Sequence, residues 1–234
     1  MLHWIVTTAW PSRVRFAFVA AMAILLAAWL CVPARAGAQS GKGDYIGSWS
    51  LSASLGYAVP NTDEYDNAVA WRLAAGYSPL PQFELDLEIG SFSTDVSQPE
   101  ENGIPTHTIA SGRLDVRPVC LTAQYRTPLP ETLSTVTLLA GVGYYFVDYE
   151  MGDEQREYYG GSGGLPDQTV DDAWGFHAGA GLEYALTARV SVAAEGRYLF
   201  LSPQASGTSV PGTRFDGSLD LNTWVFTGGV KIAF

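Results

Sequence analysis

The side chains of this 234-residue chain that are best suited to acid–base chemistry are its three histidines, His3, His107 and His177. His177 and Glu183 are six residues apart, so in a β-strand they share one face and lie about 20 Å from each other. Such a pair cannot hydrogen-bond directly, as the base and orienting acid of a catalytic site must. The sequence also lacks a phosphate-binding loop and metal-ligand spacing. We therefore expect neither an enzyme nor a metal or cofactor site.

Charged side chains recur at every second position within segments that are otherwise apolar or small, as in Glu84, Asp86 and Glu88. Period-two spacing places such residues on one face of a β-strand. Six acids and six bases share this pattern: Arg72, Glu84, Asp86, Glu88, Arg113, Asp115, Arg117, Arg126, Glu183, Glu195, Arg197 and Lys231. An unpaired buried charge is costly, so these residues predict a network of ion pairs inside a closed structure.

The opposite faces of the same segments are apolar, as in the last strand, where Trp224, Phe226, Val230, Ile232 and Phe234 alternate with smaller or polar residues. We expect eight strands, each longer than the roughly nine to eleven residues that cross a bilayer when tilted. They are residues 45–59, 68–78, 83–94, 112–126, 135–149, 172–186, 190–201 and 219–234. Short and long connections alternate, which is typical of periplasmic turns and external loops. The predicted fold class is all-β, an eight-stranded antiparallel up-and-down transmembrane barrel.

Aromatic residues gather near both ends of the apolar faces, where rings meet the two membrane interfaces. The expected outer belt consists of Tyr57, Trp71, Tyr144, Phe146, Trp174, Tyr198 and Trp224. The expected inner belt consists of Tyr77, Phe83, Tyr125, Tyr184 and Phe234. A charge at mid-bilayer costs about 2–4 kcal/mol, so faces without charge are assigned to lipid.

The first residues have the features of a secretory signal. Two arginines precede the uncharged apolar run 16–32, and small residues follow it. We expect cleavage after Ala36 or Ala38, so that residues 1–38 form a signal peptide and residues 39–234 form one barrel domain. A retained transmembrane helix is the alternative, since about 17 apolar residues is at the lower limit for spanning.

Composition limits the compartment and the partners. The formal net charge is −11, and loss of the three arginines of the signal would make it −14. Such an acidic chain does not hold nucleic acid by charge. Cys120 would be the one cysteine left, which excludes an internal disulfide and a cysteine metal site. Together with the signal, these features predict the outer membrane of a Gram-negative bacterium.

Two interpretations of the charged interior remain open. An eight-stranded barrel is wide enough only to be filled by side chains or to hold one small ligand. A network of ion pairs across the barrel would plug the lumen and stiffen it. The same charges would alternatively line a narrow polar conduit that guides a solute.

Pro118 interrupts the fourth expected strand. The outward apolar positions run Leu114, Val116 and then shift to Val119, which predicts a β-bulge at residues 117–119. Proline also removes a hydrogen bond from the ladder between strands. The proline is therefore either a device for curvature or a lateral seam through which a solute leaves the lumen for the lipid.

Four segments, in their order along the chain, are similar to the OmpW family of small outer-membrane barrels. Residues 116–125 (Val-Arg-Pro-Val-Cys-Leu-Thr-Ala-Gln-Tyr) resemble its proline-containing fourth strand, and residues 141–143 resemble its Gly-x-Gly strand. Residues 172–184 resemble its sixth strand, and residues 221–234 its terminal strand. The resemblance implies an eight-stranded barrel that admits small hydrophobic compounds and releases them laterally. The charged interior also resembles the wider group of OmpA-like small barrels.

We therefore expect a narrow porin-like passage for small solutes, hydrophobic ones included. The alternative is a plugged structural or surface-interaction barrel that acts through its acidic external loops. The expected partners are outer-membrane lipid and lipopolysaccharide, the latter through divalent cations shared with the acidic loops. The barrel-assembly machinery would recognise the C-terminal strand, which ends at Phe234, and no nucleic acid is expected to bind.

Overall fold

The computed structural model describes most of the expected barrel, namely residues 47–96, 100–101, 104–105, 112–153, 168–208 and 214–234. The expected signal peptide, His107 and most of the acidic connection between residues 150 and 171 lie outside the described residues. Within the described ranges, no helix is long and apolar enough to cross a membrane.

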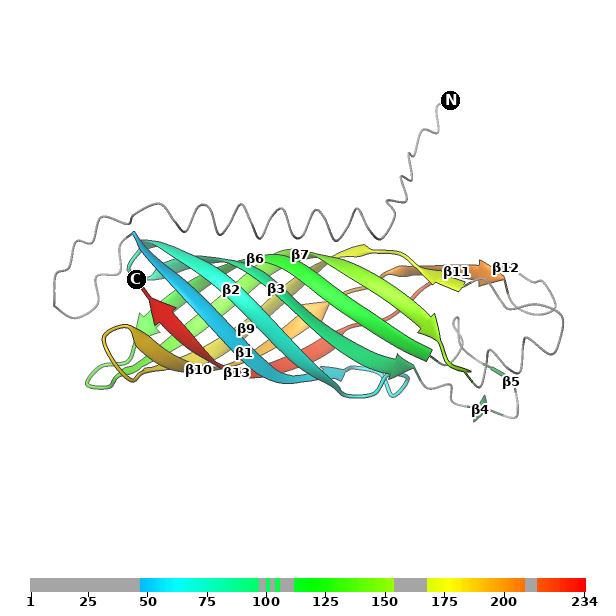
Figure 1. Cartoon of the computed structure of the whole chain (residues 1–234), viewed down its shortest axis with the longest axis horizontal. Helices are drawn as coiled ribbons and strands as arrows, with labels where there is room; N and C mark the ends of the chain where they lie inside the picture. The colour runs from blue at the N-terminus through cyan, green and yellow to red at the C-terminus, as the bar shows by residue number, and fades with distance from the viewer. Residues whose placement is uncertain (1–46, 97–99, 102–103, 106–111, 154–167, 209–213) are drawn as a thin grey trace, which may run out of the picture. The chain divides into compact units, whose positions relative to one another are not determined.

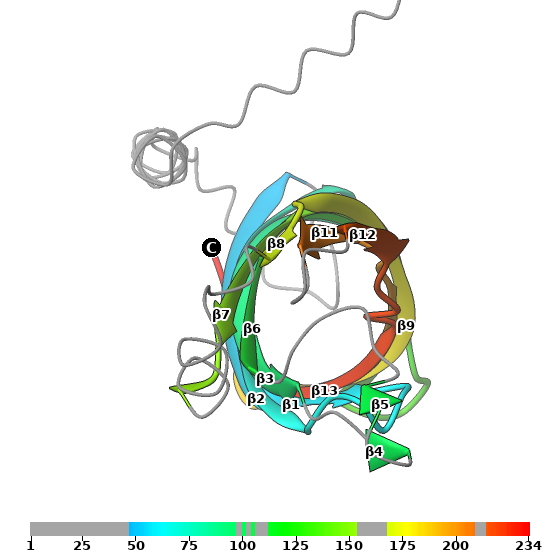
Figure 2. The same ribbon diagram turned by 90° about the vertical axis from the view of Figure 1, so that its right-hand side faces the viewer.

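Eight long strands close into an antiparallel barrel, seen from the side in Figure 1 and along its axis in Figure 2. In chain order they are β1 (Ser48–Pro60), β2 (Ala68–Leu80), β3 (Phe83–Val96), β6 (Gly112–Pro128), β7 (Ser134–Met151), β9 (Ala173–Ala185), β10 (Val190–Phe200) and β13 (Thr223–Ala233). Each pairs with the barrel strands before and after it, and β1 pairs with β13 to complete the ring. The expected fold class is confirmed, and all eight strands lie within four residues of their expected bounds.

Five shorter strands belong to the long connections and were not expected from the sequence. β4 (Glu100–Glu101) pairs with β5 (Ile104–Pro105), and β11 (Gln204–Thr208) pairs on either side with β8 (Gln168–Val170) and β12 (Arg214–Ser218). In Figure 1 they lie at the end of the barrel opposite the C-terminus. The three short turns lie at the C-terminal end, which makes that end the periplasmic one.

The outward faces carry the apolar side chains that the alternation predicts, with Leu55 at 63% exposure and Leu138 at 58%. Near the end with the long connections, Tyr144 packs against Trp174 with ring centroids 5.3 Å apart. Near the other end, Phe83 packs against Tyr125 at 5.2 Å. Aromatic rings therefore lie at both ends of the apolar band, as interfacial belts do.

Ring closure depends on a glycine. Gly56 of β1 lies opposite Thr227 of β13, and a Cβ atom at Gly56 would overlap the backbone oxygen of Phe226. No side chain fits there unless the two closing strands move apart. Gly228 differs, because a Cβ atom there would meet nothing nearer than the Ala193 oxygen at 3.9 Å.

Candidate functional site

Charged side chains fill the lumen near its periplasmic end. Glu84 of β3 accepts hydrogen bonds from Lys231 at 2.5 Å, from Arg126 at 3.1 Å and from Ser50 at 2.5 Å. Arg126 also donates to Glu183 of β9 at 2.8 Å. We call Glu84, Arg126, Glu183 and Lys231 the inner layer. Its ion pairs connect β3, β6, β9 and β13. Side chains from such separate strands reach one another only where the lumen is narrow.

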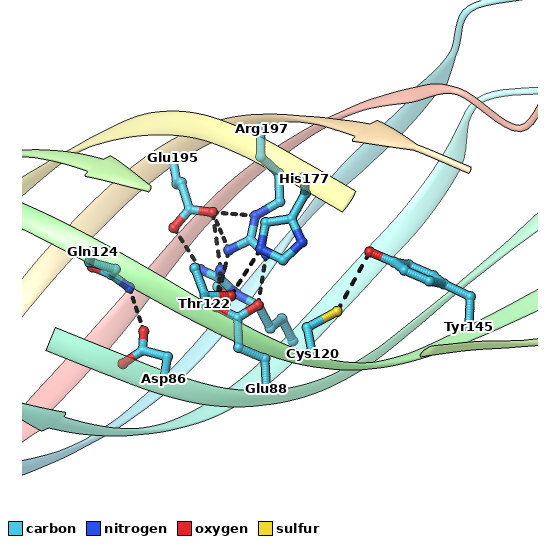
Figure 3. Close-up of polar contacts among 11 residues, drawn as sticks. Asp86, Glu88, Cys120, Thr122, Gln124, Tyr145, His177, Glu195 and Arg197 are labelled. Atoms are coloured by element: carbon cyan, nitrogen blue, oxygen red, sulfur yellow. Dashed lines mark hydrogen bonds and ion pairs between the residues drawn. The ribbon is translucent and has the colours of Figure 1, made fainter. Parts of the chain in front are cut away.

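A second set of ion pairs lies farther along the axis (Figure 3). Arg72 of β2 donates to both oxygens of Glu195 at 3.0 Å and to Glu88 at 3.2 Å. Arg197 of β10 donates to Glu88 at 2.7 Å and to Glu195 at 2.6 Å. We call these four residues the middle layer. Two cations and two carboxylates balance one another in it, so each buried charge has partners of opposite sign.

Asp86 lies between the two layers, and no cation among the described residues forms an ion pair with it. Gln124 donates a hydrogen bond to its Oδ2, and within the described residues its Oδ1 has no partner. The lumen therefore holds five acids and four bases of the twelve charges expected there. His177 is also buried, and its Nε2 lies 2.9 Å from the Thr122 hydroxyl rather than near Glu183.

The structure corrects the predicted position of the other three charges expected in the lumen. Arg113, Asp115 and Arg117 lie on the outer surface of β6, with Arg113 58% and Arg117 46% exposed. The predicted bulge at 117–119 is wrong, because β6 pairs with β7 in one unbroken register from Gly112 to Pro128. Alternation therefore continues through Pro118 and turns the three charges outward. They lie beyond the aromatic ring of Tyr144, where a charge no longer meets hydrocarbon.

The outward charges make surface ion pairs at this end of the barrel. Arg117 lies 3.1 Å from Asp148 of β7 and 3.6 Å from Asp115, and Arg113 lies 3.5 Å from Asp95 of β3. Such exposed pairs add about 0–1 kcal/mol each. They mark the level at which the strands have left the membrane.

The same parity turns apolar residues inward in the outer half of the lumen. Leu114 and Val116 are completely buried, at 0% exposure, although the sequence analysis placed them toward lipid. They belong to a buried apolar cluster whose larger members are Tyr65, Phe92, Val96, Leu114, Val116, Tyr145, Val147, Leu199, Leu201, Leu219 and Leu221. The sequence signal for this cluster is a run without alternation, as in Tyr144-Tyr145-Phe146-Val147, where one face meets lipid and the other the lumen.

Tyr65 closes the cluster from the connection between β1 and β2. It is 6% exposed and pairs with Val96 of β3 through an isolated bridge. Burial raises the pKa of its hydroxyl, and the carboxylates of Glu64 and Asp220 raise it further. Tyr65 therefore stays neutral at physiological pH, as a group packed among apolar side chains must.

Small cavities of about 20, 50 and 60 Å³ follow one another in the described part of the lumen, from the periplasmic end outward. Glu183 and Lys231 line both the first and the second, and Arg72 lines both the second and the third. The inner and middle layers therefore divide the lumen into compartments. The third, which we call the apolar cavity, is lined mainly by Ala70, Ile89, Gly90, Phe92, Pro118, Cys120, Tyr145, His177, Leu199 and Val225.

A gap in the barrel wall adjoins the apolar cavity. β3 and β6 pair from Phe83 to Ile89 and again from Phe92 to Val96, but not at Gly90 and Ser91. The residues opposite the gap are Pro118 and Arg117, which pair with β7 on their other side. A proline has no N–H to donate, which explains why the ladder stops on the β3 side. We call this gap the seam.

Comparison with known proteins identifies the family to which this barrel belongs. The family model for the outer membrane protein beta-barrel domain matches residues 22–234. The chain belongs to this family. As expected, it is a small barrel protein of the bacterial outer membrane. A search of curated proteins found no match.

Solved outer-membrane barrels share the fold. OprG from Pseudomonas aeruginosa is 15% identical, with a TM-score of 0.67 over 83% of this chain and 99% of that one. Neisserial surface protein A is 14% identical, with a TM-score of 0.51 over 80% of this chain and 96% of that one. AlkL is 18% identical, with a TM-score of 0.51 over 87% of this chain and 97% of that one. At these identities the likeness is one of fold alone.

Proposed function

We propose that this outer-membrane barrel conducts small, mainly apolar solutes into the outer half of its lumen and releases them sideways into the membrane. The observation that carries the proposal is the seam between β3 and β6, because Gly90, Ser91 and Pro118 of that seam also line the apolar cavity. A solute in the cavity is separated from lipid by a stretch of wall that lacks ladder hydrogen bonds.

The energetics of the lumen favour this route over an axial one. An apolar solute gains about 25 cal/mol for each Å² of surface that it buries, so the apolar cavity attracts it. To go further it would have to separate Glu88 from Arg197 and desolvate both. Breaking a buried ion pair costs about 3–5 kcal/mol, and an apolar solute offers no replacement partner. The middle layer therefore acts as a floor beneath the apolar cavity.

The proposal is tested by restoring the missing hydrogen-bond donor. Pro118→Val supplies an N–H on the β3 side of β6, and we expect it to lower toluene uptake several-fold in a Gram-negative host that expresses the barrel. Pro79→Val is the matched control, since Pro79 lies on β2 at the periplasmic end, away from the seam. Heat-modifiable mobility on gels shows that each variant has folded.

Two results would contradict the proposal. Unchanged toluene uptake by the Pro118→Val variant would mean that solutes do not pass the seam. Swelling of vesicles that contain the purified wild-type barrel, when they are placed in a sugar or amino-acid solution, would show an open aqueous pore through both ion-pair layers.

The second candidate function is a sealed barrel that acts at the cell surface. Its support is that both layers of ion pairs are closed, and that Asp95, Asp115 and Asp148 stand outward at the level of the lipid headgroups. Carboxylates there would share divalent cations with lipopolysaccharide phosphates. The barrel-assembly machinery is a further proposed partner and would recognise β13. Phe234, which follows β13, donates its backbone N–H to the Trp49 oxygen of β1 at 2.8 Å.

A further inference from the structure

A residue that lines the apolar cavity has one buried ring nitrogen with no hydrogen-bond partner in the part of the chain that the structure describes. His177 of β9 is 2% exposed and lines the cavity with Cys120 and Tyr145 (Figure 3). Its Nε2 meets Thr122, but its Nδ1 has no partner among the described residues. Buried polar atoms are nearly always paired with protein, water or ligand, so an unpaired one on a cavity wall points to an occupant.

The neighbours of His177 determine which kind of partner Nδ1 needs. Glu88 accepts hydrogen bonds from Arg72 at 3.2 Å and from Arg197 at 2.7 Å, so its side chain acts as an acceptor. The Thr122 hydroxyl also hydrogen-bonds Glu88, and its proton therefore points to that side chain. The Thr122 oxygen must then accept from His177, which places the imidazole proton on Nε2. Nδ1 is left with a lone pair, and it requires a donor.

The charged groups at the cavity are already paired with one another. Arg72, Arg197 and Glu88 are held in the middle layer, and the Tyr145 hydroxyl lies 3.5 Å from the Cys120 thiol. Apart from the hydroxyls of Ser91 and Thr227 the remaining wall is mainly apolar, so a charged compound would lose its hydration without gaining a partner of opposite sign. A neutral compound loses much less.

We propose that the apolar cavity binds a small neutral compound with one hydroxyl or N–H donor on an apolar body, such as a short alcohol, and that the donor bonds to His177 Nδ1. The cavity of about 60 Å³ is room for roughly four to six water-sized groups, which is the size of such a compound. The inference rests on the proposed function, in that it takes the cavity as a point on the solute's route, and it names the class of solute.

The test compares two isomers of equal formula. 1-Butanol carries a donor, and diethyl ether has none. The purified barrel in lipid nanodiscs, with ¹⁵N-labelled histidine, is titrated with each, and the His177 Nδ1 resonance is followed by NMR. We expect a saturable shift with 1-butanol and an affinity at least five times that for the ether. His177→Phe should lower the 1-butanol affinity to that for the ether, whereas Leu199→Ile, a volume-conserving change in the same wall, should keep the difference.

Equal affinities for the two isomers, or an Nδ1 resonance that neither of them moves, would overturn the inference and assign the cavity to water. Both results come from the wild-type barrel, so they hold even if a variant does not fold. The test is also separate from transport. If 1-butanol binds but toluene uptake is independent of Pro118, the proposed route fails and the binding site remains. If uptake depends on Pro118 but the isomers bind alike, the route remains and this site fails.

Discussion

Replacing Arg197 by methionine removes one cation from the middle layer and keeps much of the side-chain volume. Arg197 is 8% exposed and holds Glu88 at 2.7 Å and Glu195 at 2.6 Å. In the variant, these two buried carboxylates share Arg72 as the one cation of the middle layer. Breaking a buried pair by removing one partner costs about 3–5 kcal/mol, and we expect the free energy of unfolding to fall by that amount.

The assay is reversible urea unfolding of the barrel in lipid vesicles, followed by tryptophan fluorescence. Arg117→Met is the matched control, because Arg117 pairs with Asp148 on the outer surface and is 46% exposed. Its loss should cost no more than about 1 kcal/mol. Adding Glu88→Gln to Arg197→Met restores one carboxylate per arginine in the middle layer, and should recover a large part of the loss. The reasoning is refuted if Arg197→Met costs no more than Arg117→Met, or if the double variant recovers nothing.

Two further substitutions test the barrel wall. Gly56→Ala should destabilise the barrel by about 1–3 kcal/mol or stop it from folding, because the new methyl group overlaps the Phe226 backbone; Gly228→Ala, which meets ordinary contacts, should be near neutral in the same unfolding assay. Leu138→Arg, at a site 58% exposed on the lipid face of β7, should cost about 2–4 kcal/mol. The same change at Leu129 in a periplasmic turn should cost far less, and equal losses at the two sites would contradict the assignment of that face to lipid.

The strands were predictable because membrane and lumen impose opposite demands on alternate residues. In β3, Phe83, Leu85 and Leu87 meet lipid while Glu84 and Asp86 meet the lumen, so the parity is readable from the sequence. The strands of the long connections were missed because these opposite demands do not act on them. β11 and β12 lie beyond the aromatic rings, where no hydrocarbon enforces alternation.

The inner and middle layers were predictable as a set of inward charges, but their pairings were not. The bond between Glu84 and Lys231 depends on the curvature of the whole barrel, which no local pattern contains. The error at Leu114 and Val116 has a different cause. Their side chains point into the apolar cluster of the lumen, whereas the sequence reasoning assumed that apolar side chains of β6 point to lipid. Pro118 then suggested a bulge that would change which face of the strand points outward. The unpaired nitrogen of His177 depends on the rotamers of its neighbours, and so it was also beyond sequence reasoning.

The bonds of the two ion-pair layers join positions far apart along the chain. Glu84 and Lys231 are separated by 147 residues, Arg72 and Glu195 by 123, and Glu88 and Arg197 by 109. Each of these bonds joins a strand of the first half of the chain to one of the second half, so we expect them to form late in folding. Interactions that form after the transition state slow unfolding and leave the folding rate unchanged. We therefore expect the two layers to slow the unfolding of the finished barrel more than they change the rate at which it inserts into the membrane.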